Sequence, residues 1–321
     1  MKIEIVTPAP PRSRYGNRVT AIRWARILRS LRHRVHLAQA YEGELCDLLV
    51  ALHARRSYDS ICRFRADHPD CPILLALTGT DLYHDLPRSR RAQKSLELAT
   101  RLIVLQPKAG EELESRLREK VRVIYQSAQA LGPAPLARGA PRSQPAFDVC
   151  VIGHLRPVKD PFRAALAARR LPAASRVRIV HLGAAMNEGM ARRARAEMKV
   201  NPRYHWLGET PPRRLRQIMR RSALCVLSSR LEGGANVVSE AVVAGVPLLA
   251  SRIPGSVGLL GESYPGYFAV GDTTGLAHLL RRAENERTFL RRLSSCCRKL
   301  APLFDPRREQ KAWKRLLQEV V

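Results

Sequence analysis

The 321-residue sequence has no apolar run long enough to cross a membrane. Its most apolar stretch, AVVAGVPLLA, is interrupted by glycine and proline. The first residues, MKIEIVTPAP, alternate like a strand and reach proline too soon for the apolar core of a signal peptide. We therefore expect a cytoplasmic protein without a transmembrane segment.

The sequence also lacks the residue spacings that are typical of metal sites. Its seven cysteines are odd in number, none belongs to a C-x-x-C pair, and no Asp-x-Asp motif is present. The adjacent Cys296 and Cys297 lie in a basic helical stretch, LRRLSSCCRKL, and incidental thiols are a simpler interpretation there than a metal or redox site. We expect reduced thiols, no metal and no cofactor.

The chain has few aromatic and acidic residues compared with its many arginines. Aromatic residues make up 5% of the chain, and its formal net charge is +28. Such a charge suits nucleic acid, an acidic membrane surface or small anionic substrates. However, the arginines are spread over helical patterns such as RRLRQIMRR, and few aromatics are available to stack on single-stranded bases. We interpret most of the charge as solvated surface and keep a basic nucleic-acid-binding module as our third hypothesis.

Short apolar runs alternate with amphipathic stretches along the chain. Runs such as DLLVAL (47–52) and LCVLSS (224–229) are typical of buried strands, and residues 21–31 and 88–98 have helical patterns. Strands that alternate with helices predict parallel sheets built from β–α–β units. The sequence therefore predicts an α/β fold with two Rossmann-like, doubly wound domains, whose ligands bind at the carboxyl ends of the strands.

The segment at 128–146 is rich in Pro, Ala and Gly and has no apolar periodicity. This composition is typical of a linker. We therefore predict an N-terminal domain at residues 1–127 and a C-terminal domain at residues 147–305.

The stretch LEGGANVVSEAVVAGVPLLAS carries two glutamates, Glu232 and Glu240, around a glycine pair. The pattern predicts a strand, a loop and a helix that starts near Ala235. Glycine in the loop permits close approach of the backbone or a positive φ. The free amides at the helix start suit a diphosphate, and Glu240 could accept hydrogen bonds from the hydroxyls of a ribose. Pairing of both glutamates with nearby arginines is an equally strong alternative.

A second motif, DVCVIGHLRPVKDPFRAALAA, predicts a buried strand followed by a turn that carries His154, Arg156 and Lys159. Two cations on such a turn can stabilise the charge that develops on a departing phosphate. A surface turn with incidental basic residues is the rival interpretation in a chain so rich in arginine.

The C-terminal half resembles the nucleotide-sugar glycosyltransferases of the GT-B fold, close to glycosyltransferase family 4. The resemblance lies in the Glu-x7-Glu motif of Glu232 and Glu240 and in the following EAVVAGVP. It implies that Glu232 contacts the transferred sugar, that Glu240 holds the ribose, and that Lys159 faces the diphosphate. The family's arginine five residues before that lysine is His154 here, and we expect Arg156 to supply its positive charge.

The N-terminal half resembles the same fold through TPAPPRSRYGNRVTAIRWARIL and LLALTGTDLYHD. The resemblance implies that Gly16 and Asn17 lie at the turn where acceptor and donor phosphates meet. Thr78 stands where the family usually has a histidine, and Gln126 and Ser127 replace a common Asn-Gly. In this fold a terminal helix crosses back onto the first domain, which we expect of residues 306–321.

The combination of TPAPPRSRYGNRVTA, LHARRS, LTGTDLY, GHLRPVKDP and IPGSVGLLGESYPGYF is similar to the selenosugar synthases of selenoneine biosynthesis. The resemblance implies transfer of the sugar of UDP-GlcNAc or UDP-glucose to selenophosphate, with release of UDP. It also implies a selenophosphate synthetase and a selenoneine synthase as functional neighbours. A conventional family-4-like enzyme acting on a lipid or saccharide acceptor is the second hypothesis.

These arguments define the candidate site residues. Lys159, Arg156 and Glu232 are the expected catalytic group, and no metal is expected. The expected donor-binding residues are Gly16, Asn17, His154, Arg156, Lys159, Glu232, Gly233, Gly234, Ala235, Asn236, Val237 and Glu240. The candidates for holding selenophosphate are Arg12, Arg14, His53, Arg55, Arg56, Thr78, Thr80 and Gln126. Arginine suits phosphate oxygens through bidentate contacts. His53 is the best candidate for a general base, and a hydrogen-bonded core histidine is an equally strong interpretation of it.

Overall fold

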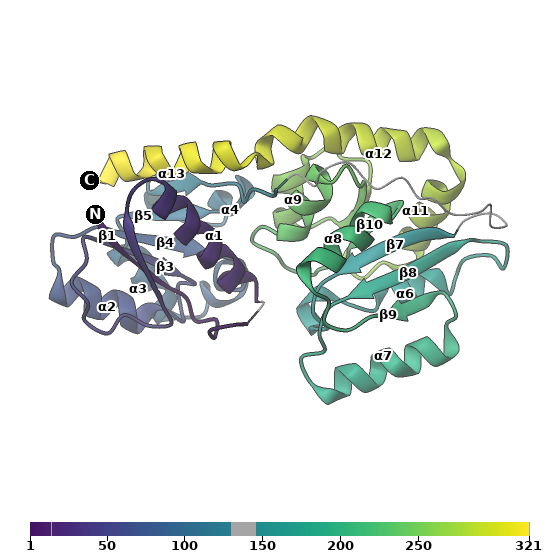
Figure 1. Ribbon diagram of the computed structural model, residues 1–321, viewed down its shortest axis with the longest axis horizontal. Coiled ribbons are helices and arrows are strands. Elements are labelled where there is room, and N and C mark those ends of the chain that lie inside the picture. Colours follow the sequence, from purple (N-terminus) through teal and green to yellow (C-terminus); the bar gives the residue numbers. More distant parts are fainter. Residues whose placement is uncertain (14, 130–145, 321) are drawn as a thin grey trace. The chain divides into compact units, whose positions relative to one another are not determined.

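The computed structural model describes residues 1–13, 15–129 and 146–320, which form two compact units (Figure 1). The first unit comprises Met1–Ser127, Glu232–Asn236 and Leu303–Val321, and the second comprises Ala128–Leu231 and Val237–Pro302. Arg14 and most of the predicted linker lie outside the described residues.

The first unit contains a six-stranded parallel sheet in the order β2-β1-β3-β4-β5-β6. Its central strands β3 and β4 are buried along their whole length, as their uninterrupted apolar sequences LLVAL and ILLAL predict. The strands are β1 (Lys2–Val6), β2 (Arg34–Ala38), β3 (Leu48–Leu52), β4 (Ile73–Leu77), β5 (Arg101–Val104) and β6 (Val121–Val123).

Helices cover both faces of this sheet. Trp24 of α1 (Gly16–Ser30) and Trp313 of α13 (Pro306–Val320) are fully buried in one apolar cluster with β1, β3, β4 and β5. Their rings pack edge to face with centroids 5.0 Å apart. Phe64 of α2 (Tyr58–Asp67) and Leu96 of α3 (Arg90–Leu98) belong to the cluster on the other face. The shorter helical segments are the π-helical turn η1 (Asp81–Asp85), α4 (Lys108–Glu111) and α5 (Ser115–Arg118).

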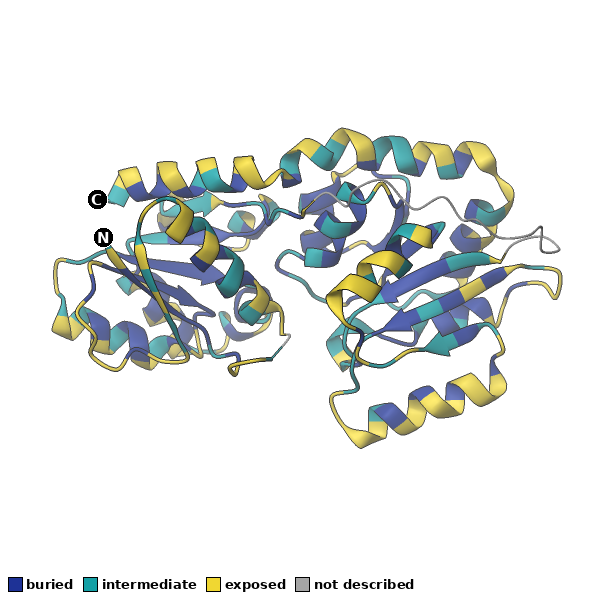
Figure 2. Cartoon of the chain, in the orientation of Figure 1, coloured by how far each residue is buried: buried dark blue, intermediate teal, exposed yellow. Residues whose placement is uncertain are grey.

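The second unit repeats this architecture with a six-stranded parallel sheet in the order β12-β11-β10-β7-β8-β9. Figure 2 shows the strands of both sheets mainly buried, and the helices exposed on their outer sides. The strands are β7 (Phe147–Ile152), β8 (Val177–Leu182), β9 (Tyr204–Trp206), β10 (Leu224–Leu227), β11 (Leu248–Ser251) and β12 (Tyr267–Phe268).

The helices of the second unit begin at residues that suit a helix start. Pro212 and Pro254 occupy the first position of their helices, where the missing N–H costs nothing, and the side chains of Asn187 and Asp272 accept hydrogen bonds from the first turn. The helices are α6 (Arg163–Ala168), α7 (Glu188–Val200), α8 (Pro212–Arg221), α9 (Asn236–Val243), α10 (Pro254–Leu260), α11 (Thr273–Asn285) and α12 (Arg287–Leu300). Two 3-10 turns are η2 (Pro157–Lys159) and η3 (Ala301–Phe304).

The strand order of each sheet reverses once, which creates a topological switch point. In the first unit the reversal lies between β1 and β3, and in the second it lies between β7 and β10. Ligands of open α/β sheets bind outside the carboxyl ends of strands at such points. The predicted α/β class with two parallel sheets is confirmed, and the switch points indicate the edge of each sheet at which a ligand is expected.

Candidate functional site

The turn of the second C-terminal motif and the residues that lead into the glutamate motif meet at the switch point of the second unit. A small cavity there is lined by Gly153, His154 and Lys159 after β7 and by Ser228 and Ser229 after β10. The Ser228 hydroxyl donates a hydrogen bond to the Lys159 carbonyl at 3.2 Å, which ties the two loops together. The structure therefore joins at one edge two segments that lie about seventy residues apart in sequence.

The turn after β7 presents three of the predicted donor-binding side chains. Arg156 precedes η2, Lys159 ends it, and both are half-buried. His154 is also half-buried, and its Nδ1 accepts a hydrogen bond from the Ala184 amide at 3.2 Å. A neutral His154 therefore carries its proton on Nε2, because one ring nitrogen is already an acceptor. The turn combines two cations with one imidazole donor, an arrangement suited to diphosphate oxygens.

His181 supports this turn, and sequence analysis did not select it. The imidazole is buried, with Nε2 3.1 Å from the Gly153 carbonyl and Nδ1 2.9 Å from the Tyr204 hydroxyl. Burial lowers the pKa of His181 to about 4, so it is neutral and donates from Nε2 to Gly153. Beside it, Gly183 has φ +154°, and a Cβ there would lie 2.0 Å from the Gly153 oxygen. In the sequence, the histidine inside the apolar run RVRIVHLG could have indicated a buried, hydrogen-bonded side chain.

The loop from β10 to α9 carries the glycine pair, and its residues 232–236 group with the first unit. A Cβ on Gly233 would lie 2.5 Å from the Thr78 oxygen, and one on Gly234 would lie 2.5 Å from the Leu105 Cβ. Neither glycine has a positive φ. Of the two roles expected of this pair, the structure therefore shows close approach. Glu232, which precedes the pair, is half-buried.

Helix α9 begins at Asn236, one residue after the predicted start at Ala235. The Asn236 side-chain oxygen accepts a hydrogen bond from the Arg23 guanidinium of α1. Ala235 and Val237 are buried. Glu240 lies in the middle of the helix and is half-buried, whereas the positions on either side of it are buried. Glu240 thus has partial access to solvent on a mostly apolar helix.

The first helix of the chain starts earlier than its apolar pattern predicts. We expected a helix from residue 21 and a turn at Gly16 and Asn17, but α1 begins at Gly16. Both residues thus belong to its first turn, which contains no acidic side chain. Arg12 is exposed with φ 62°, and Arg14 lies outside the described residues. The spacing of apolar residues did not reveal the first turns of the helix, because only the second half of α1 contributes large side chains to the core.

Three acceptor candidates follow β3. His53 is buried and has φ 80°, an unusual conformation for a residue other than glycine. Its Nδ1 lies 3.4 Å from the Arg56 amide, and its Nε2 lies 3.3 Å from the Thr80 hydroxyl. Arg55 forms an ion pair with the buried Asp85 at 2.9 Å, whereas the Arg56 side chain is exposed. This geometry favours the hydrogen-bonded core histidine over a general base.

The remaining acceptor candidates follow β4 and β6. Thr78 and Thr80 are half-buried and flank the buried Gly79, just before Asp81. Gln126 is buried, and its amide donates a hydrogen bond to the Thr20 hydroxyl at 2.5 Å. Within the described part of the chain, the Gln126 Oε1 atom has no hydrogen-bond partner.

Asp81, which sequence analysis also missed, organises this edge of the first unit. It is fully buried and accepts hydrogen bonds from the amides of Ala54 (3.1 Å), Thr78 (2.9 Å) and Gly79 (2.8 Å). A buried carboxylate is tolerable only with such partners. Because Ala54 follows β3 and Thr78 follows β4, Asp81 fixes the two loops to each other. In the sequence, TGTD directly after an apolar strand could have indicated a carboxylate that accepts hydrogen bonds from a turn.

The family model for Glycosyl transferases group 1 matches residues 138–299, which is half of the chain. The chain belongs to this family. Its fold matches a solved structure of Anabaena Alr3699/HepE in complex with UDP and glucose (TM-score 0.80, 16% identity, 99% of this chain and 100% of that one). It also matches sucrose-phosphate synthase from Thermosynechococcus elongatus (TM-score 0.79, 14% identity, 99% and 98% covered). No curated protein matches the sequence.

A structure described as "Trehalose-6-phosphate from E. coli bound with UDP-2-fluoro glucose" matches as well, with TM-score 0.75, 12% identity and both chains fully covered. These likenesses confirm the GT-B architecture expected from the sequence. At such identities they establish the fold of this group 1 glycosyltransferase and leave its substrates to be inferred from its own residues.

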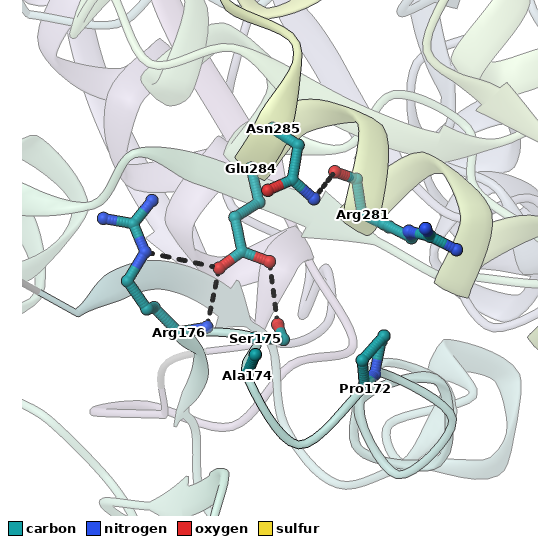
Figure 3. Close-up of a pocket in the computed structure, with 7 residues that line it drawn as sticks. All are labelled: Pro172, Ala174, Ser175, Arg176, Arg281, Glu284 and Asn285. Carbon is teal, nitrogen blue, oxygen red and sulfur yellow. Dashed lines mark hydrogen bonds and ion pairs between the residues drawn. The ribbon is translucent and has the colours of Figure 1, made fainter.

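A larger cavity lies away from these motifs. It has a volume of about 470 Å³ and borders the amino end of β8, between Pro172, Arg176 and the end of α11 (Figure 3). Glu284 in its wall accepts hydrogen bonds from the Ser175 hydroxyl at 2.8 Å and the Arg176 amide at 2.6 Å. The hydrogen-bonding capacity of this carboxylate is thus met by neighbouring residues of the chain. The volume of the cavity is not by itself a reason to call it a substrate site.

The described residues contain no group of three or more His, Cys, Asp or Glu side chains that could hold a metal ion. No helix among them is both long and apolar enough to span a membrane. The cysteines of the described residues are unpaired, and Cys297 is buried, which raises the pKa of its thiol.

Proposed function

We propose that this glycosyltransferase transfers the sugar of UDP-GlcNAc or UDP-glucose to selenophosphate, forms a carbon–selenium bond and releases UDP. Membership of the group 1 family supports glycosyl transfer, and solved structures of similar fold contain UDP with glucose or UDP-2-fluoro glucose. The similarity of the whole chain to selenosugar synthases supports the unusual acceptor. A selenophosphate synthetase would supply this acceptor, and a selenoneine synthase would use the product.

One observation carries the choice of acceptor. The carboxyl edge of the first sheet presents Arg56 and Thr80 around a buried, satisfied Asp81, while Arg55 is paired with Asp85. Guanidinium and hydroxyl donors suit a compact, strongly anionic nucleophile. A lipid acceptor would instead need a largely apolar surface at this edge.

In the proposed reaction, selenium attacks the anomeric carbon as the bond from that carbon to the diphosphate oxygen breaks. UDP leaves with the bonding electron pair, and Lys159, Arg156 and the loop amides near Asn236 stabilise its charge. Glu232 orients the sugar hydroxyls, and Glu240 accepts hydrogen bonds from the ribose. Hydrolysis of the phosphorus–selenium bond then leaves the selenosugar. A selenium anion is nucleophilic without help, so the scheme assigns no general base.

The direct test is UDP release by purified protein with each UDP-sugar, with and without selenophosphate made enzymatically in the same vessel. The proposal predicts release that depends on selenophosphate and is lost in Glu240→Ala. Orthophosphate at the same concentration is the control for a generic anion. Release that requires a lipid or saccharide, and ignores selenophosphate, would replace this function by conventional glycosyl transfer. Salt-dependent binding of nucleic acid without any UDP release would overturn both.

A further inference from the structure

The strained, buried His53 requires an explanation, because the proposed reaction gives it no chemical role. A left-handed backbone is unfavourable for a residue that carries a Cβ. Such strain in a native protein tends to gather at functional positions, where surrounding contacts hold it. Here the His53 amide donates to the Ala76 carbonyl at 2.9 Å, so the residue is fixed to β4 as well as to its own loop.

The protonation state of His53 follows from its neighbours. Nδ1 faces the Arg56 amide, which can only donate, so Nδ1 must be the acceptor. Burial lowers the pKa of His53, and the charges of Arg56 and Arg55 lower it further, while Asp81 and Asp85 act in the opposite direction. The imidazole is therefore neutral at pH 7, with its one proton on Nε2.

This tautomer determines what Thr80 can do. The Nε2–H group has the Thr80 hydroxyl as its acceptor at 3.3 Å, whereas the Asp85 carboxylate lies beyond hydrogen-bond distance at 3.8 Å. Because Nε2 already carries a proton, the Thr80 hydroxyl can accept from it but cannot donate to it. The hydroxyl proton of Thr80 is thereby directed away from His53, and Thr80 is half-exposed.

We propose that His53 is a positioning residue that holds the Thr80 hydroxyl as a hydrogen-bond donor to the anionic acceptor. Asp81 supports the pair, because its carboxylate bonds the amide of Ala54 on one loop and that of Gly79 on the other. Arg56 lies on the same loop with an exposed guanidinium, whereas Arg55 is held by Asp85. The acceptor anion thus meets Thr80 and Arg56, and His53 acts only through Thr80. This inference rests on the proposed function for the identity of the anion.

The first test measures the imidazole itself and needs no substrate. Nitrogen-15 NMR of protein labelled in histidine, with His53 assigned by its loss in His53→Gln, reports which ring nitrogen carries the proton. We expect the neutral Nε2–H form at pH 7. A cationic ring or an Nδ1–H form would overturn the inference whatever the enzyme's activity.

The second test is a double-mutant cycle on the acceptor KM. His53→Leu removes the donor, while His53→Gln keeps an amide N–H near the Nε2 position and shares the same unbranched Cβ. We expect His53→Leu and Thr80→Val each to raise the acceptor KM about tenfold or more, with a smaller change in kcat. Their combination should cost little beyond either one, and His53→Gln and Thr80→Ser should stay close to wild type.

The outcomes separate the two proposals. Additive effects of His53→Leu and Thr80→Val, or equal losses in His53→Gln and His53→Leu, would overturn the positioning role while the selenosugar activity stands. A wild-type protein that makes no selenosugar would overturn the proposed function. The NMR result would still decide whether His53 holds Thr80. Thermal unfolding of each variant identifies any loss that comes from misfolding alone.

Discussion

The indole of Trp24 donates a hydrogen bond to the Glu309 carboxylate at 2.9 Å, although the two residues stand 285 positions apart in sequence. The second carboxylate oxygen accepts from the Ser127 amide, also at 2.9 Å. Glu309 is 2% exposed, and the Ser127 hydroxyl donates a third hydrogen bond to it, so these partners stabilise the buried carboxylate. This contact fixes α13 to α1 and to the end of the first sheet.

Replacement of Glu309 should destabilise the first unit. Glu309→Leu leaves the buried Trp24 N–H and the half-buried Ser127 N–H without their acceptor, and we expect a loss of roughly 2–4 kcal/mol in the free energy of unfolding. Urea unfolding followed by tryptophan fluorescence measures it, since Trp24 and Trp313 both lie in this unit. Glu319→Gln is the matched control, because its ion pair with Arg122 is about one-third exposed and should contribute about 1 kcal/mol or less. Equal losses in the two variants would contradict this account.

Gly183 should tolerate no side chain. Gly183→Ala combines an unfavourable φ with a Cβ that would lie 2.0 Å from the Gly153 oxygen, so β7 must shift. We expect a loss of more than about 3 kcal/mol in the free energy of unfolding. Gly245→Ala, at φ +73° with open space around its Cβ, isolates the backbone strain and should cost only about 1 kcal/mol. Similar thermal melting of the two variants would refute the steric argument.

The sequence predicted the sheets well because fully apolar runs such as LLVAL and ILLAL have few alternatives to burial. The sequence also predicted the turn with Lys159 and the loop with Gly233, because cations and glycines that directly follow a buried strand indicate an anion-binding turn or loop. It did not reveal Asp81, His181 or Glu309. Each of these is a buried polar residue, and its partners come from other parts of the chain. The spacing of apolar residues along the sequence does not reveal such long-range contacts. The sequence alone therefore could not distinguish these buried polar residues from polar residues exposed to solvent.

The neutral state of His181 makes the second unit sensitive to acid. Its pKa is about 4 in the fold and near 6.5 when unfolded, so the unfolded chain binds more protons between these values. Stability is therefore fully present above about pH 6.5 and falls as the pH drops toward 4, by roughly 3 kcal/mol. His181→Gln keeps a donor for Gly153 and should reduce this loss. The exposed His278→Gln is the control, and urea unfolding at several pH values compares them; parallel pH profiles for His181→Gln and wild type would disprove the assignment.

Lys159 should act mainly on the departing diphosphate. We expect Lys159→Ala to lower kcat for UDP release about 100-fold or more, because a cation that meets charge formed in the transition state is lost. Lys159→Arg should recover part of this activity. The exposed Lys199→Ala on α7 controls for a general change of charge. A change in the donor KM alone, with kcat unaffected, would show that Lys159 binds substrate and transition state equally.

The most direct test of the central claim is the mass spectrum of the product formed from UDP-GlcNAc or UDP-glucose and selenophosphate. The account predicts a sugar that carries the isotope pattern of one selenium atom, absent without protein and absent in Glu240→Ala. UDP release accompanied only by free sugar, or by a product without selenium, would contradict the proposed carbon–selenium bond.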